Sequence, residues 1–254
     1  MLYLGLDLHG TLLCSDERFP LDCLDEMCSL LDALSPKVVA LTCTGNDLSF
    51  VKKVLPDELL ARLSGFVLET GCTYASSLDG PEEILVNDEV VGAREELEKR
   101  FKGLNSPLVT RFGRRLATIS LFTEKPRPFR DEVATKVDAW GFSSIFGVTY
   151  SSVAVDIVPL GYDKLRGLRA AAAKEPLVAV ADSVNDIPLL GGADYSFAPA
   201  NLAREAKREL QANGRQIREL AHVDLLTKEI LYVSPSAETK GVIEILRKLK
   251  SIVQ

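Results

Sequence analysis

Residues 4–13 read Leu4-Gly-Leu-Asp7-Leu-His9-Gly-Thr11-Leu-Leu13, an apolar run that ends in an acidic residue and continues into a Gly-Thr turn. A short apolar run bounded by a turn signal is typical of a buried strand. Open parallel α/β sheets bind their ligands at the carboxyl ends of the strands. The stretch therefore predicts either a functional carboxylate, Asp7, at the ligand-binding edge of a sheet or an ordinary strand end with Asp7 in the following turn.

A second stretch repeats this pattern. Residues 177–186 read Leu177-Val-Ala-Val-Ala-Asp182-Ser-Val-Asn185-Asp186, again an apolar run that ends in a carboxylate, with another acidic residue four positions later. Three carboxylates from two strand ends suit Mg²⁺, which takes oxygen ligands and is completed by water and substrate phosphate. Taken alone, Asp182 and Asp186 are also compatible with turn and helix-cap positions.

Two further segments supply groups that bind phosphate. Thr44 and Gly45 follow the apolar run 37–43, and their hydroxyl and backbone N–H groups are able to cradle the oxygens of a dianion. A carboxylate attacks phosphorus only when the charge of the phosphate is neutralised by a cation and an ammonium. Lys164 is the candidate ammonium, although a lysine on the surface of a helix is the commoner case.

Taken in order, these four motifs resemble those of the haloacid dehalogenase (HAD) superfamily phosphatases, and the resemblance covers nearly the whole chain. The chain is similar to the branch in which a large cap is inserted late, the type IIB group of sucrose-phosphatase and phosphomannomutase-like proteins. The resemblance implies an α/β fold with a HAD-like doubly wound parallel-sheet core, formed by residues 1–70 and 160–254. It also implies an inserted α+β cap domain, formed by residues 71–159.

The resemblance also implies roles for individual residues. The expected nucleophile is Asp7, which forms an aspartyl-phosphate, and the expected phosphate-binding residues are Thr44, Gly45, Lys164 and Asn185. The expected Mg²⁺ ligands are Asp7, the backbone carbonyl of His9, Asp182 and Asp186. The implied activity is a Mg²⁺-dependent phosphatase that hydrolyses a small phosphorylated metabolite, such as a sugar phosphate or a phosphorylated sugar acid.

His9 departs from the family pattern, because the superfamily usually has an acid–base Asp two residues after the nucleophile. Imidazole titrates near neutrality and is chemically able to act as both acid and base. Three interpretations of His9 follow: a working catalytic acid–base, a slow phosphatase limited to good leaving groups, or a catalytically impaired protein that binds a phosphorylated ligand. A phosphosugar mutase, which returns the phosphoryl group to substrate, is a further alternative.

The composition is that of an ordinary globular enzyme. The chain of 254 residues is 46% hydrophobic and 26% charged with a formal net charge of −6, so it gives no support to nucleic-acid binding. We expect no membrane span, because no apolar stretch approaches about 20 residues. The start of the chain lacks a basic segment, and the five cysteines lie within the first 72 residues without a paired metal spacing. We therefore expect a cytoplasmic protein with reduced thiols, whose oligomeric state the sequence leaves open.

Periodicity predicts the other elements of the two domains. In the cap, helices are expected at 89–101 and 129–140 and strands at 108–112, 116–122 and 153–158. In the core, a helix is expected at 201–212 with Asn201 as its N-cap, and another at 239–249. The cap also holds a basic cluster, which either faces the substrate or is a solvated surface. Its members are Arg111, Arg114, Arg115, Lys125, Arg127 and Arg130.

Overall fold

The computed structural model describes residues 1–150 and 153–253 and contains two compact units. The first unit comprises Met1–Pro81 and Asp163–Gln254, and the second comprises Glu82–Tyr162. The first boundary lies after residue 81 rather than after residue 70. The reason is strand β4 (Thr73–Ala75), which pairs antiparallel with β3 (Phe66–Leu68) and so keeps residues 71–81 with the first unit.

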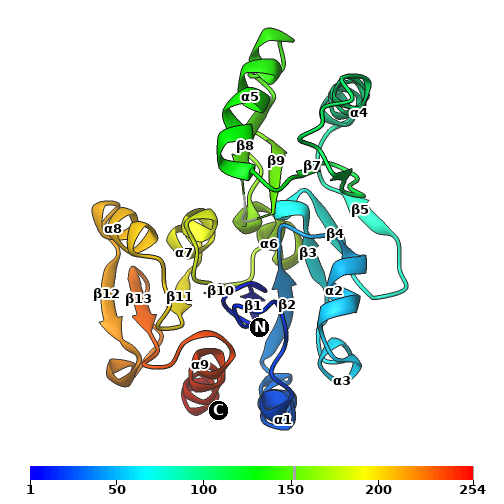
Figure 1. Cartoon of the computed structure of the whole chain (residues 1–254). Coiled ribbons are helices and arrows are strands. Elements are labelled where there is room, and N and C mark those ends of the chain that lie inside the picture. Colours follow the sequence, from blue (N-terminus) through cyan, green and yellow to red (C-terminus); the bar gives the residue numbers. More distant parts are fainter. Residues whose placement is uncertain (151–152, 254) are drawn as a thin grey trace. The chain divides into compact units, whose positions relative to one another are not determined.

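A mainly parallel sheet forms the centre of the first unit (Figure 1). Its order is β12-β13-β11-β10-β1-β2-β3-β4, and neighbouring strands are parallel except β3 and β4. The other strands are β1 (Leu2–Leu6), β2 (Val38–Cys43), β3 (Phe66–Leu68), β10 (Leu177–Val180), β11 (Tyr195–Ala198), β12 (Gln216–Glu219) and β13 (Ile230–Val233). The chain builds outward from β1 in one direction and from β10 in the other. The neighbouring strands β1 and β10 therefore form the topological switch point, where open α/β sheets bind ligands.

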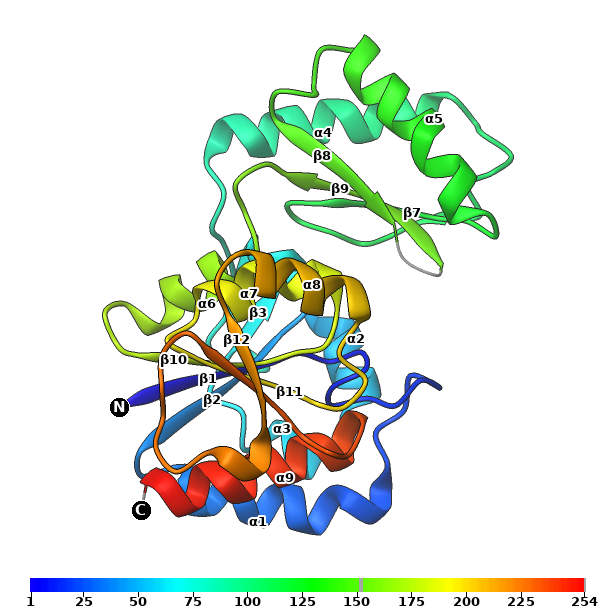
Figure 2. The ribbon, with the colours of Figure 1, turned by 90° about the vertical axis from the view of Figure 1, so that its left-hand side faces the viewer.

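Helices cover both faces of this sheet. Figure 2 shows α1 and α9 on one face and α6, α7 and α8 on the other. The helical segments are η1 (Leu21–Cys23), α1 (Leu24–Leu34), α2 (Leu48–Val54), α3 (Asp57–Leu60), η2 (Glu69–Gly71), α6 (Lys164–Ala172), η3 (Val184–Asp186), α7 (Ile187–Gly192), α8 (Arg204–Ala212), η4 (Leu220–His222) and α9 (Glu238–Val253). Along β10, Val178 and Val180 join the core beneath α1 and α9, whereas Leu177 and Ala179 join the core beneath α6 and α7. Burial on both faces explains why this strand is apolar throughout.

The second unit packs two helices against an antiparallel sheet of order β6-β7-β9-β8. Its elements are β5 (Glu82–Ile84), α4 (Asp88–Gly103), β6 (Arg111–Phe112), β7 (Ile119–Phe122), α5 (Pro126–Ala139), β8 (Phe146–Tyr150) and β9 (Ala154–Pro159). Leu97 of α4 and Val133 of α5 are buried in one cluster with Ile119 of β7. The unit is α+β, as the resemblance implies, and the predicted cap helices and strands are present with shifted ends.

Several elements differ from the expectation. Helix α8 begins at Arg204, and the predicted N-cap residue, Asn201, lies in the preceding loop. The residue at the N-cap position is Ala203, whose side chain makes no capping bond. Strands β4, β5, β8 and β12 are short or partly exposed, and their sequences do not predict strands. Strand β13 reads Ile-Leu-Tyr-Val and is largely buried, so its apolar run is a strand signal that the sequence analysis missed.

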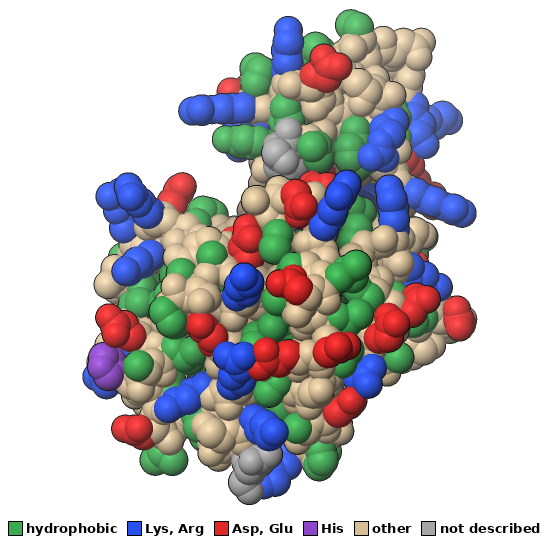
Figure 3. Space-filling view, turned by 60° about the horizontal axis from the view of Figure 1, so that its bottom comes forward, with side chains coloured by type: hydrophobic (Ala, Val, Ile, Leu, Met, Phe, Trp, Pro, Cys, Tyr) green, Lys and Arg blue, Asp and Glu red, His purple; other side chains and the backbone are tan. Residues whose placement is uncertain are grey.

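The surface agrees with the composition. On the face shown in Figure 3, acidic and basic side chains alternate over the first unit instead of gathering into one basic patch. All five cysteines are free thiols, and four of them are buried. Among the described helices, none combines the length and the apolar character that crossing a membrane requires.

Candidate active site

The strand order of the first unit brings the sequence motifs to one edge of the sheet. Leu6 at the end of β1 is in register with Val180 of β10 on one side and with Thr42 of β2 on the other. Asp7 therefore follows the central strand, with Asp182 beyond one neighbour and Thr44 beyond the other. All three residues emerge where parallel strands end, which is the ligand-binding edge of an open α/β sheet.

Lys164 is the first residue of α6, and its ammonium bridges two of the predicted carboxylates. Its Nζ lies 2.6 Å from Asp7 Oδ1 and 2.6 Å from Asp186 Oδ1. All three side chains are buried, with Asp186 fully inaccessible. Burial alone would lower the pKa of Lys164, but the charges of Asp186 and Asp7 outweigh it and raise that pKa, so the ammonium stays protonated.

The Asp186 carboxylate has donors on both oxygens. Oδ1 accepts from Lys164, and Oδ2 accepts from the Ser183 hydroxyl at 2.6 Å and from the Ser183 backbone N–H at 3.2 Å. These two bonds come from the 3-10 turn η3, whose first residues form a capping box. The turn therefore fixes the position of Asp186, which in turn holds Lys164 beside Asp7.

Asp182 has neutral donors instead. Its Oδ1 accepts from the Thr11 hydroxyl at 3.3 Å, and its Oδ2 accepts from Asn201 Nδ2 at 2.9 Å. Gly10 has a φ of +68°, and a Cβ built there would overlap the Asp182 carboxylate. Glycine is therefore required after His9, because it lets the β1 loop approach this carboxylate.

The cluster carries more negative than positive charge. Burial and the Asp186 charge raise the pKa of Asp7 to about 7, even though Lys164 opposes the shift. The same two causes raise the pKa of Asp182 to about 6. Oxygen atoms of Asp7, Asp182 and Asp186 lie within 4.8 Å of one another. A group of oxygen ligands with unbalanced negative charge fits a hard divalent cation such as Mg²⁺.

The predicted phosphate-binding loop follows β2. Thr44 is buried, and its Oγ1 accepts from the Asn46 backbone N–H at 3.2 Å and from Asn46 Nδ2 at 3.4 Å. Both bonds use Oγ1 as an acceptor, so the hydroxyl hydrogen of Thr44 stays available to donate. Gly45 is exposed beside it, and Asn185 is exposed on η3. The assigned roles of these residues in holding phosphate stay predictions.

His9 lies in the loop after Asp7 and is held weakly. Its ring stacks on Phe50, with centroids 5.5 Å apart, and its Nε2 lies 3.9 Å from Glu17 Oε1. Its side chain is 43% exposed. Burial lowers the pKa of His9 while Glu17 opposes that shift, so the neutral imidazole is favoured.

In the second unit, some members of the predicted basic cluster have local partners. The Arg111 guanidinium stacks on the Phe122 ring, with its carbon 3.3 Å from the centroid. Arg115 Nε donates to Ser120 Oγ at 3.2 Å, and the Ser120 hydroxyl donates to Asp156 at 2.5 Å. Burial raises the pKa of Asp156. The proposal that the cluster contacts substrate stays a prediction.

Sequence reasoning assigned no role at this site to Thr11, Ser183 or Asn201. Ser183 stands directly after Asp182, but a serine in a turn carries no signal for the carboxylate it binds. Asn201 comes shortly after strand β11, and its position after a strand is the signal that could have indicated the site. Its capping pattern instead predicts the start of a helix.

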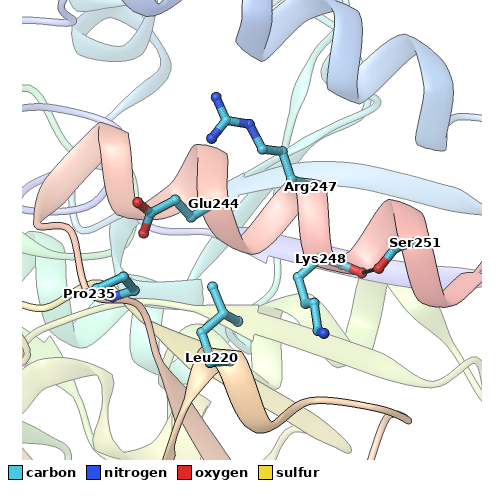
Figure 4. Close-up of a pocket in the computed structure, with 7 residues that line it drawn as sticks. Leu220, Pro235, Glu244, Arg247, Lys248 and Ser251 are labelled. Carbon is cyan, nitrogen blue, oxygen red and sulfur yellow. Dashed lines mark hydrogen bonds between the residues drawn. The ribbon is translucent and has the colours of Figure 1, made fainter.

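A surface pocket of about 380 Å³ lies apart from these motifs, between η4, the loop after β13, and α9. In Figure 4, Lys248 points from α9 to the same side as Leu220, and Arg247 points away. The one acidic residue that lines it, Glu244, already accepts a hydrogen bond from Ser236 at 2.8 Å. The pocket holds none of the predicted catalytic residues.

Comparisons with known proteins agree with the fold. No protein-family model matches the sequence. A phosphoglycolate phosphatase from Methanopyrus kandleri is 27% identical over 215 residues, which span 80% of this chain and 85% of that protein.

Two solved structures illustrate the structural likeness. The sucrose-phosphatase from Synechocystis sp. PCC6803, in complex with sucrose and phosphate, has a TM-score of 0.64 at 14% identity, with 100% of this chain and 99% of that chain covered. A haloacid dehalogenase-like hydrolase from Bacteroides thetaiotaomicron has a TM-score of 0.66 at 13% identity, with 97% and 98% covered. At these identities the structures establish a shared fold. Together with the related phosphatase sequence, they support the resemblance to the haloacid dehalogenase superfamily, and the chain has a haloacid dehalogenase-like fold.

Proposed function

We propose that the chain is a Mg²⁺-dependent phosphatase that acts on a small phosphorylated metabolite through an aspartyl-phosphate. The observation that carries this proposal is the buried Asp7 carboxylate at the switch point of the sheet, held 2.6 Å from the Lys164 ammonium beside Asp182 and Asp186. A bound Mg²⁺ would neutralise phosphate charge and orient it, with Asp7 and Asp182 as direct ligands. Asp186, whose two oxygens already have donors, would contribute through water or through Lys164.

The chain's own residues account for the proposed steps. An oxygen of Asp7 attacks phosphorus, and the bond from phosphorus to the leaving oxygen breaks. Lys164 and the Thr44 hydroxyl stabilise the charge on the transferring oxygens. Water then attacks the phosphorus of the aspartyl-phosphate, which releases inorganic phosphate and restores the Asp7 carboxylate.

We assign the proton transfers to His9. Its neutral, half-exposed imidazole is able to take a proton from the attacking water, and the resulting imidazolium is able to give one to the next leaving oxygen. The backbone carbonyl of His9 stays a proposed Mg²⁺ ligand, because it does not depend on the side chain.

The names of two relatives support the proposed substrate class. One is named a phosphoglycolate phosphatase and another a sucrose-phosphatase, so phosphorylated sugar acids and sugar phosphates are the proposed substrates. We place the reaction in the cytoplasm, since the five cysteines are free thiols.

Hydrolysis assays of the wild type, Asp7→Asn and His9→Ala test this function with and without Mg²⁺. Wild-type turnover of p-nitrophenyl phosphate should require Mg²⁺, and Asp7→Asn should abolish it because an amide cannot attack phosphorus. His9→Ala should lose about 10²–10⁴-fold on alkyl phosphates. It should lose less on p-nitrophenyl phosphate, whose leaving group needs little protonation. Turnover that survives Asp7→Asn would refute the proposal, and an equal loss on both substrates would remove His9 from the acid role.

A further inference from the structure

Asn201 connects three segments of the first unit at the carboxylate cluster. It lies in the loop after β11, the strand next to β10. Its Nδ2 donates to the Gly10 backbone carbonyl at 2.8 Å and to Asp182 Oδ2 at 2.9 Å. Its Oδ1 accepts from the backbone N–H of Glu238, at the start of α9, at 2.8 Å. One amide therefore joins the loops after β1 and β10 to the last helix.

These contacts allow only one orientation of the amide. With the amide reversed, Nδ2 would face the Glu238 N–H, a donor against a donor. Oδ1 would then face the Gly10 carbonyl and the Asp182 carboxylate, an acceptor against two acceptors. The Glu238 N–H thus directs the two amide hydrogens of Asn201 toward Gly10 and Asp182.

The backbone of the same loop holds Asp182 as well. The Ala203 N–H donates to the Asp182 backbone carbonyl at 2.8 Å. Asp182 is consequently held at its main chain by Ala203 and at its carboxylate by Asn201 and Thr11.

The charge of these donors distinguishes Asp182 from its neighbours. Asp7 and Asp186 are both paired with the Lys164 ammonium. In the described part of the chain, the donors to the Asp182 carboxylate are a hydroxyl and an amide, both neutral. A neutral donor orients a carboxylate and leaves its charge for a cation, whereas an ammonium would compete with that cation.

We propose that Asn201 is a positioning residue that holds the Asp182 carboxylate in place to bind Mg²⁺. This inference rests on the proposed function for the identity of the metal, and it assigns a role to a residue that is not among the proposed metal ligands. Residues that orient metal ligands typically contribute about 10–100-fold to metal affinity.

The test measures Mg²⁺ binding directly, by isothermal titration calorimetry of the full chain without substrate. Asn201→Ala should raise the Kd for Mg²⁺ by about 10–100-fold. Asn201→Leu, which keeps most of the side-chain volume and removes all three hydrogen bonds, should do the same, so the test does not depend on one variant folding. In turnover assays, the fold-increase in the Mg²⁺ concentration for half-maximal rate should exceed the fold-decrease in kcat at saturating Mg²⁺.

Thr239→Val supplies the matched control. The Thr239 hydroxyl is buried at the start of α9, beside Glu238, and donates to the Leu12 backbone carbonyl at 2.9 Å without touching Asp182. This variant loses a buried hydrogen bond in the same region and should keep the wild-type Kd.

Four outcomes would overturn one or both proposals or separate them. A wild-type Kd in a folded Asn201→Ala or Asn201→Leu variant would overturn the inference, as would an equal rise in Thr239→Val. A wild type that binds no Mg²⁺ would overturn both the inference and the metal dependence of the proposed function. Weakened Mg²⁺ binding in the Asn201 variants, together with a wild type that hydrolyses no phosphate ester, would support the inference and refute the phosphatase activity.

Discussion

The two ends of strand β10 carry opposite charge balances. At its amino end, the Asp194 carboxylate accepts from the Leu177 backbone N–H at 2.9 Å and pairs with Lys228 at 2.9 Å and with Arg169 at 3.4 Å. One carboxylate there has two cations, and hydrogen bonds from Leu177 and Lys228 outweigh burial and lower the pKa of Asp194.

At the carboxyl end, three carboxylates lie close together, and the Lys164 ammonium pairs with two of them, Asp7 and Asp186. Burial and mutual repulsion raise the pKa of Asp7 and of Asp182. The same strand thus has a balanced end and an unbalanced end. Unbalanced buried charge costs stability, and a protein retains it where a ligand supplies the missing charge. The comparison supports the proposed function at the carboxyl end and assigns a stabilising role to the amino end.

The largest expected effect comes from removing the one ammonium of the carboxyl end. Lys164→Met keeps the length of the side chain and leaves Asp7 and Asp186 buried without their cation, which should cost about 3–5 kcal/mol of folding free energy. Urea denaturation without divalent cation measures this loss, and hydrolysis of p-nitrophenyl phosphate should be abolished.

The control for this prediction is Lys52→Met. Lys52 forms an exposed pair with Asp79 at 3.5 Å, and exposed pairs contribute little to stability. Its denaturation midpoint should match that of the wild type. A Lys164→Met protein as stable as Lys52→Met would show that the ammonium does not balance the buried carboxylates.

Asp7→Asn should act in the opposite direction. The variant removes one of the three negative charges, and its amide oxygen can still accept from Lys164. Without divalent cation, it should be more stable than the wild type by roughly 0.5–2 kcal/mol, because functional sites are seldom optimised for stability.

Adding Mg²⁺ should reverse that order. A ligand at 100 times its Kd stabilises a folded protein by about 2.7 kcal/mol, and the wild type alone should gain this amount. Urea denaturation in EDTA and in Mg²⁺ measures both effects. If Asp7→Asn proved less stable than the wild type in EDTA, the carboxyl end would not hold excess charge.

The sequence indicated the unbalanced end more completely than the balanced one. Asp7 and Asp182 each end an apolar run, and this local pattern places them at strand ends without knowledge of the tertiary structure. The order of the motifs, through the family resemblance, added Thr44 and Lys164. The structure brings Asp7, Lys164, Asp182 and Asp186 into one cluster.

The contacts that hold this cluster could not be predicted from local patterns. Asn201 matches the pattern of a helix cap, and its actual partners depend on β11 pairing with β10 and on α9 returning to the β1 loop. Asp194 stands between a helix and a strand, and its two cations come from distant parts of the chain. Short edge elements such as β12, whose residues are mostly exposed, lack the apolar periodicity that identifies strands.

The smallest expected effect belongs to the balanced end. Asp194→Asn keeps an oxygen that can accept from the Leu177 N–H and removes only the charge that faces Lys228 and Arg169. Both of these cations are substantially exposed, so solvent screens the pairs and the loss at pH 7 should be about 0.5–1 kcal/mol.

The pH dependence of this loss has a defined sign. Because the folded-state pKa of Asp194 lies below the ordinary value of 3.8, its charge stabilises the fold above that pH. This contribution disappears as the pH falls through the folded-state pKa. Urea denaturation of the wild type and Asp194→Asn should therefore give a free-energy difference that shrinks between pH 7 and about pH 3. If the free-energy difference between the wild type and Asp194→Asn instead increased toward low pH, the uncompensated charge would lie at the amino end of β10. The comparison between the two ends would then be reversed.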